Sequence, residues 1–129
     1  MLLDTNILIW LFTDRSKIGK TTLRTLERAD TLAVHVASLH EVAIKQRLGK
    51  LGNLFDELII QIKEQRITRL AVTDAQLQAY ILLNQEPHRD PFDLLIVATA
   101  IQLQLPLVTS DKRLLVMKYD NLKVIDARK

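Results

Sequence analysis

The chain opens with the stretch Met1-Leu2-Leu3-Asp4-Thr5-Asn6-Ile7-Leu8-Ile9-Trp10, which indicates the fold of the whole protein. Residues 1–4 are typical of a short buried strand, and residues 5–12 are typical of a helix that starts directly after it. A buried strand that passes at once into a helix favours an α/β domain with a mainly parallel sheet.

The same alternation of strands and helices continues through the chain. Further strands are predicted over residues 32–36, 68–72, 107–109 and 123–125, the last at the sheet edge. Helices are predicted over residues 21–29, 38–48, 54–65, 73–84, 92–103 and 111–117, with a turn over 16–20 and a polar loop over 86–91. Gly49 is a good stop signal for the helix before it. We find no internal repeat and no linker, so residues 1–129 are expected to form one domain.

The composition of the chain excludes several kinds of functional site and several classes of protein. The chain has no cysteine, which excludes disulfides, thiolate metal sites and cysteine nucleophiles. We see no secretory signal, and the longest apolar run, residues 94–101, is far too short to cross a bilayer. A cytoplasmic protein without a membrane partner is therefore expected. A net charge of +3 and a pI of about 9.3 suit a polyanionic partner, but many proteins without one share these values.

Four acidic residues share one kind of position. Asp4 and Asp111 follow predicted strands, and Glu41 and Asp93 lie in the first turn of predicted helices. In an open parallel sheet such positions converge on the crevice outside the carboxyl ends of the strands. Carboxylates gathered there repel one another unless a cation is present, and oxygen ligands favour Mg²⁺ or Mn²⁺. One or two such ions can drive phosphodiester hydrolysis without a nucleophilic side chain.

Each of these acids also has a purely structural interpretation, because Asp and Glu are favoured in the first turns of helices. The segment Ser38-Leu39-His40-Glu41 has the pattern of a capping box, and Asp90-Pro91-Phe92-Asp93 has a similar one. Glu41 and Lys45 have the spacing of a helical ion pair. Asp111 can simply cap the last helix. Capping does not exclude metal binding, so both interpretations stay open on spacing alone.

The segments that carry the acids resemble the PIN-domain family, and within it the VapC-type toxins of toxin–antitoxin pairs. The matching segments occur in the family's order over nearly the whole chain: Leu2-Leu3-Asp4-Thr5-Asn6 followed by Ile7-Leu8-Ile9-Trp10, Ser38-Leu39-His40-Glu41-Val42-Ala43-Ile44-Lys45, Gly49-Lys50-Leu51, His88-Arg89-Asp90-Pro91-Phe92-Asp93-Leu94-Leu95-Ile96-Val97-Ala98, and Leu105-Pro106-Leu107-Val108-Thr109-Ser110-Asp111. Each segment is weakly specific alone, but together they are strongly specific.

The resemblance implies a three-layer α/β/α sandwich and an endoribonuclease that depends on Mg²⁺ or Mn²⁺. It also implies an RNA substrate, a cognate antitoxin and a homodimer. Carried over by position, the catalytic and metal-binding residues are Asp4, Glu41, Asp93 and Asp111. Small polar residues that match positions around this site are Thr5, Asn6 and Thr109. Asp90 is either an extra acid of the site or simply the cap of its helix.

The basic and histidine residues also have both a functional and a purely structural interpretation. Lys45, one turn beyond Glu41, is a candidate RNA contact, and so are Arg15 and Lys17, although a solvated basic face is their default interpretation. His35 is expected to be a packed strand residue, His40 to point away from the acids, and His88 to lie in a solvated loop.

Two rival functions remain at this point. The first is a catalytically idle PIN fold that serves as a binding module, which the four intact acids argue against. The second is a receiver-like acidic pocket, which needs an Asp at the end of the third strand. Asp74 has instead the position of a helix cap, so this function ranks low.

Overall fold

The sheet matches the predicted strand arrangement closely. A computed structural model describes residues 1–83 and 90–129 of the chain. Its five-stranded sheet has the order β3-β2-β1-β4-β5, and each of the four pairings is parallel. The strands are β1 (Leu2–Leu3), β2 (Ala33–His35), β3 (Thr68–Leu70), β4 (Leu107–Thr109) and β5 (Val124–Asp126). The last strand lies at an edge, as predicted, and β3 forms the other edge.

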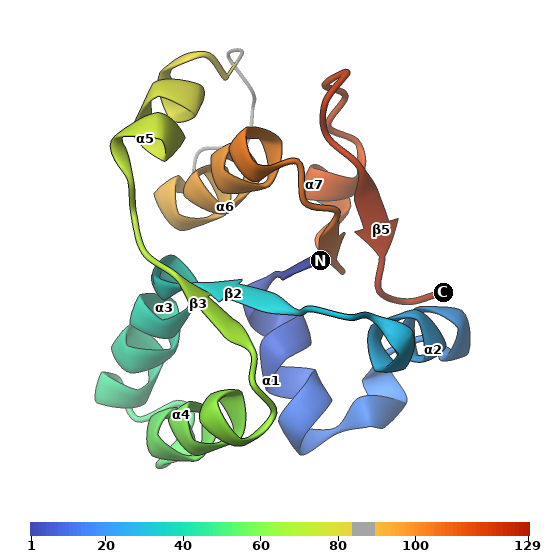
Figure 1. The fold of residues 1–129 in the computed structure, drawn as a ribbon. Helices are drawn as coiled ribbons and strands as arrows, with labels where there is room; N and C mark the ends of the chain where they lie inside the picture. Colours follow the sequence, from blue (N-terminus) through green and yellow to red (C-terminus); the bar gives the residue numbers. More distant parts are fainter. Residues whose placement is uncertain (84–89) are drawn as a thin grey trace.

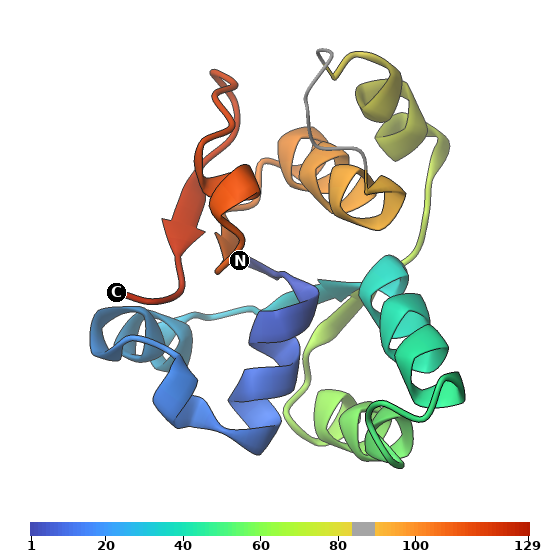
Figure 2. The ribbon, with the colours of Figure 1, turned by 180° about the vertical axis from the view of Figure 1, so that it is seen from behind.

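Helices cover both faces of this sheet (Figures 1 and 2). One layer contains α1 (Thr5–Thr13), α2 (Lys20–Arg28), α3 (Val36–Arg47) and α4 (Leu54–Glu64). The opposite layer contains α5 (Asp74–Ile81), α6 (Pro91–Leu103) and α7 (Lys112–Leu115). The predicted three-layer α/β/α sandwich is thereby confirmed. Among the described residues, no helix is long and apolar enough to cross a bilayer.

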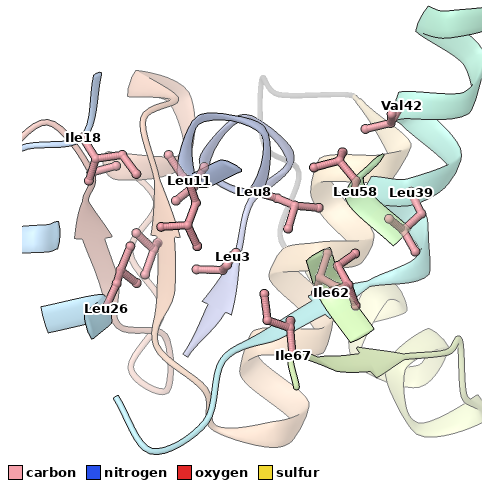
Figure 3. Close-up of a cluster of buried hydrophobic side chains, with 14 residues drawn as sticks. Leu3, Leu8, Leu11, Ile18, Leu26, Leu39, Val42, Leu58, Ile62 and Ile67 are labelled. Carbon is pink, nitrogen blue, oxygen red and sulfur yellow. The ribbon is translucent and has the colours of Figure 1, made fainter. Parts of the chain in front are cut away.

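The strands hold the two layers together because their side chains alternate between the faces of the sheet. Leu3, Val34 and Val108 point into the layer of α1–α4, while Leu2, Ala33 and Leu107 point toward α6 and α7. Figure 3 shows the first cluster, which groups Leu3 of β1 with side chains from α1, α3 and α4. Full burial of one such Leu, Ile or Val contributes about 1.5–3 kcal/mol.

One predicted helix start is wrong, and with it the predicted capping box. Helix α3 begins at Val36, so Ser38 lies inside the helix and Glu41 lies in its second turn rather than its first. The cap is His35, whose ring Nδ1 accepts the backbone N–H of Ala37 at 2.9 Å. A histidine at the end of β2 thus caps the helix before the expected serine is reached.

Other boundaries differ by a few residues. A short 3₁₀ helix, η1 (Arg15–Lys17), overlaps the start of the predicted turn. Gly49 follows α3 with a φ of +76°, a conformation that suits glycine, so its role as a stop is confirmed. The helix predicted to reach about residue 84 ends at Ile81 and is capped by Thr73. Residue 84, His88 and most of the loop predicted over 86–91 lie outside the described residues.

Candidate active site

The topology places the ends of β1 and β4 side by side. Strand β1 is central, and the chain continues from it to β2 and β3 on one side, with β4 and β5 on the other. This reversal creates a crevice at the carboxyl ends of the strands, which is where open α/β sheets bind ligands. Asp4 directly follows β1, Asp111 lies two residues after β4, and α3 starts where β2 ends.

A small polar pocket lies in this crevice. Its volume is about 150 Å³, and its lining is Asp4, Thr5, Asn6, Glu41, Asp90, Asp93, Asp111 and Arg113. The structure therefore brings together the four predicted acids, the extra acid Asp90, and two of the predicted polar neighbours. We call this lining set the acid pocket. Arg113 is the member that the sequence analysis missed.

Asp4 is the most deeply buried acid of the pocket, with 5% of its surface exposed. Its Oδ1 accepts the backbone N–H of Thr5 at 2.8 Å, which caps α1, and its Oδ2 accepts the hydroxyl of Thr109 at 2.6 Å. Burial raises the pKa of Asp4, the two hydrogen bonds lower it, and repulsion from Glu41 and Asp111 raises it further. The rise in pKa means that a negatively charged Asp4 lacks compensating positive charge.

Thr109 links two of the acids through one hydroxyl. While it donates to Asp4, its oxygen accepts the backbone N–H of Asp111 at 3.0 Å. Thr109 is fully buried at the end of β4, so this link fixes the position of the loop that carries Asp111 relative to β1. The predicted supporting role of Thr109 therefore has a concrete geometry.

Glu41 reaches the acid pocket from the second turn of α3. Its Oε1 accepts the Thr5 hydroxyl at 3.1 Å, and the same hydroxyl lies 2.9 Å from the Oγ of the fully buried Ser38. Its Oε2 lies 3.1 Å from the Nζ of Lys45, which confirms the expected ion pair. Lys45 thus balances Glu41 at the rim of the pocket, where its side chain is 36% exposed.

The start of α6 supplies the remaining carboxyl groups. Asp90 caps the helix, because its Oδ1 accepts the backbone N–H groups of Phe92 and Asp93. Asp93 lies in the first turn of α6, as predicted. The ring of His40 meets Phe92 edge-on, with centroids 5.2 Å apart, and this contact joins α3 to α6 beside the pocket. His40 therefore packs against an aromatic ring, which agrees with the expectation that it points away from the acids.

Three other predicted residues lie away from the acid pocket. Arg15 and Lys17 follow the far end of α1, and a helix of nine residues separates its two ends by about 13 Å at ~1.5 Å per residue. Arg15 pairs there with Glu27 at 3.5 Å, and Lys17 lies 5.9 Å from the ring of Trp10. His35 is fully buried and bonds Gln76 of α5 at 2.8 Å, so the packed role expected for it is confirmed.

The acid pocket suits a hydrated divalent cation better than a bare one. In the part of the chain that the structure describes, no three His, Cys, Asp or Glu side chains converge closely enough to hold a metal ion. The carboxyl groups instead surround a space of about 150 Å³, and one water needs only about 10–15 Å³ of such space. Mg²⁺ characteristically keeps several of its waters and takes only one or two carboxylates directly. Oxygen donors and room for water therefore fit this ion class.

A larger groove of about 430 Å³ lies elsewhere, at the far end of α1. Its lining is Leu11, Phe12, Arg15, Leu26, Glu27, Ala29, Asp30, Leu32, Gln65, Arg66 and Ile67. Its charged residues are two of each sign, whereas the acid pocket sets five carboxyl groups against the single guanidinium of Arg113, and one of these carboxyl groups, Asp4, has a raised pKa. A buried carboxyl group with a raised pKa that lies in a cleft among other acids indicates a functional site, so we place the candidate active site at the acid pocket.

Comparisons with known proteins agree with this fold. The family model described as PIN domain matches residues 1–118. Ribonuclease VapC22 from Mycobacterium tuberculosis is 28% identical over 115 residues, which is 88% of this chain and 88% of that protein. The crystal structure of VapBC2 from Rickettsia felis, bound to a DNA fragment from their promoter, has a TM-score of 0.74 at 21% identity and covers 97% of this chain and 96% of that chain. A toxin-antitoxin complex from Klebsiella pneumoniae has a TM-score of 0.65 at 21% identity and covers 94% and 93%.

Proposed function

Because this chain belongs to the PIN domain family, we propose that it is a divalent-metal-dependent endoribonuclease and the toxin of a toxin–antitoxin pair. The observation that carries the proposal is the acid pocket: five carboxyl side chains line one small space at the carboxyl ends of β1 and β4. The name of the relative, Ribonuclease VapC22, supports the same activity. We treat residues 1–129 as one nuclease domain that works in the cytoplasm on RNA.

The proposed roles follow from the geometry. Asp4 would be the principal ligand of Mg²⁺ or Mn²⁺, with Asp93 and Asp111 supporting the ion through its bound waters. Glu41 would bind the ion directly or through a water. Such a cation, when bound, lowers the pKa of a water molecule and neutralises charge on the scissile phosphate. Thr109 and Thr5 keep Asp4 oriented through bonds of 2.6 and 2.8 Å. Asn6 lines the same pocket.

The residues around the acids would orient the carboxylates and contact the RNA rather than take part in the reaction. Thr5 and Ser38 hold the Glu41 carboxylate toward the pocket, and residues that support a ligand in this way matter nearly as much as the ligand. Lys45 lies beside Glu41 and would meet a phosphate at the rim of the pocket. Arg15 and Lys17 would meet only an RNA long enough to extend along α1.

Protein partners belong to the same proposal. The known structures with this fold include toxin–antitoxin complexes. A hollow beside α4 in this chain has apolar residues in its lining, among them Leu54, Leu58 and Ile60. We place the antitoxin on this apolar side of the molecule. For the homodimer we favour the exposed apolar side chains of α5, namely Leu77, Ile81 and the adjacent Leu82.

The experiment that tests the proposal is cleavage of a panel of structured RNAs by the purified protein with Mg²⁺, Mn²⁺ or EDTA. Wild-type protein is expected to cut only with a divalent ion. An Asp4→Asn, Asp93→Asn double variant is expected to lose at least about 10–100-fold in rate. Asp74→Asn is the matched control, because Asp74 also lies in the first turn of a helix but outside the acid pocket. Equal cleavage by the double variant and the control would refute the site.

A binding measurement separates an idle PIN fold from an enzyme with an unknown target. Mn²⁺ that binds only the folded state stabilises it by about 2.7 kcal/mol at a concentration of 100 Kd. We expect this gain in the wild type and in Asp74→Asn, and its loss in the double variant. No gain in the wild type would favour the idle binding module.

A further inference from the structure

Among the residues that the structure describes, Arg113 is the only positively charged one in the lining of the acid pocket. It holds the carboxylate of Asp111 from both sides. Its Nη2 lies 3.1 Å from Oδ2, its Nε lies 3.3 Å from Oδ1, and its backbone N–H donates to Oδ1 at 2.8 Å. The pKa of Arg113 is raised by Asp111 first, and also by Asp93 and Asp90 on another helix. The guanidinium thus occupies the field of several pocket acids.

The pairing of Arg113 with Asp111 is easily exchanged for another. The Arg113 side chain is 65% exposed, and exposed ion pairs of this kind add little net stability. Helix α7, which carries Arg113, has only four residues, so rigid secondary structure does not fix the long side chain. A guanidinium offers a planar fork of donors that fits a phosphate as well as it fits a carboxylate.

A cation in the acid pocket competes with Arg113 for the same oxygens. Both Oδ atoms of Asp111 are engaged by the arginine in the present arrangement. A divalent ion that takes either oxygen also repels the guanidinium, because both are positive. The displaced guanidinium is then free to bind another anion, and an RNA substrate bound at the acid pocket supplies a phosphate.

We propose that Arg113 changes partner during the reaction cycle: it holds Asp111 before the divalent cation binds, and it binds an RNA phosphate once the cation occupies the acid pocket. This inference rests on the proposed function and deepens it. It adds a substrate-binding residue, and it makes RNA binding by that residue depend on the cation. Linkage requires that the phosphate in turn favours the cation-bound state.

The first test measures Mn²⁺ binding by calorimetry, without RNA. Arg113→Gln removes the competing charge, so Mn²⁺ is expected to bind about three- to tenfold more tightly than to the wild type. Lys112→Gln is the matched control, since it removes the same charge one residue away at a side chain that does not line the pocket. Arg113→Lys keeps the charge and is expected to stay near the wild type.

The second test measures the binding of a labelled mixed-sequence single-stranded RNA by fluorescence anisotropy, with EDTA or with Mn²⁺, at several salt concentrations and at times before cleavage. With Mn²⁺, Arg113→Gln is expected to weaken binding about three- to tenfold and to reduce the salt slope by about 0.7, as for one lost phosphate contact on a single strand. With EDTA, it is expected to differ from Lys112→Gln by less than twofold.

The two tests separate failure of this inference from failure of the proposed function. If the wild type binds Mn²⁺ but Arg113→Gln binds it no more tightly, Arg113 does not compete with the ion and the inference is wrong. An equal loss of RNA affinity with EDTA and with Mn²⁺ also overturns it, because the arginine then binds phosphate without any exchange of partner. If the wild type itself binds no Mn²⁺, the proposed function and the inference fall together.

Discussion

Replacing Thr109 with valine removes one hydroxyl from beneath the acid pocket and nearly preserves the shape of the side chain. Two hydrogen bonds disappear: the one to Asp4 Oδ2 at 2.6 Å and the one from the Asp111 backbone N–H at 3.0 Å. A bond to a charged group contributes about 1.5–3 kcal/mol and a neutral one about 0.5–1.5 kcal/mol. Because Thr109 is fully buried, water cannot replace its hydroxyl beside Asp4. We expect Thr109→Val to lower the free energy of unfolding by about 2–4 kcal/mol at pH 7.

Thr99→Val is the matched control for this substitution. Thr99 is also fully buried, and its hydroxyl donates to the carbonyl oxygen of Leu95 at 2.8 Å. That carbonyl lies within α6 and already accepts a backbone N–H of the helix. Removal of the Thr99 hydroxyl therefore leaves the carbonyl of Leu95 with a hydrogen-bond partner. The expected cost is below about 1 kcal/mol. The two variants thus differ in what the hydroxyl contacts rather than in the atoms removed.

The assay is urea unfolding of wild type and both variants in EDTA, from pH 7 down to pH 4. The Thr109 bond stabilises the ionised form of Asp4, whose folded pKa is raised above 3.8. Removal of this bond raises the folded pKa of Asp4 further in the variant, so the difference between wild type and Thr109→Val should be full above the variant's pKa and shrink as the pH falls from there to the wild-type pKa. A Thr109→Val cost no larger than that of Thr99→Val, or one that is constant with pH, would refute the reasoning.

Two further predictions concern other parts of the fold. Gly19→Ala is expected to lower the free energy of unfolding by about 1–3 kcal/mol, as overpacking does, because the added Cβ would lie 2.2 Å from the backbone of Lys129. Urea unfolding measures this change, and unchanged stability would mean that the C-terminal backbone moves aside without cost. Burial lowers the pKa of His35, although its bond to Gln76 raises it in part. The unfolded chain therefore takes up a proton near pH 6.5 before the folded protein does, so stability is full above that pH and falls below it. His35→Asn is expected to lose this slope in the same assay, and equal slopes in both proteins would count against it.

The parts of the fold that depend on local sequence were predictable. The strand predicted over 107–109 has the observed bounds, because a buried apolar pair ends there at Thr109 and a capping aspartate follows. The gathering of the acids also followed from the sequence, since parallel strands with helical crossovers bring their carboxyl ends to one edge of the sheet. Asp4, Asp90 and Asp111 were predicted both as caps and as site residues, and each one caps a helix and lines the acid pocket.

The parts that depend on distant contacts were not predictable. His35 caps α3 only because Gln76, 41 positions later, fixes its ring, and no local pattern announces that pair. Arg113 pairs with Asp111, two residues before it, but this local pair gave no signal that Asp90 and Asp93, from a distant segment, line the same pocket. The close approach of Gly19 to Lys129 likewise joins two segments that are far apart in the sequence, and no local pattern predicts it.

The way the acid pocket is supported explains why it should attract cations. Its buried acids are held by hydroxyl groups of Thr5, Ser38 and Thr109, which orient a carboxylate without cancelling its charge. The two cations nearby, Lys45 and Arg113, lie at exposed rims where their pairs contribute little. Because its pKa is raised, Asp4 alone contributes stability to the metal-free protein that is full below about pH 3.8 and is lost as the pH rises through the folded pKa. A divalent ion bound beside Asp4 would reverse this contribution, because it favours the ionised carboxylate. Under the proposed function, part of the stability that the ionised Asp4 costs at neutral pH would therefore be regained when the cation binds.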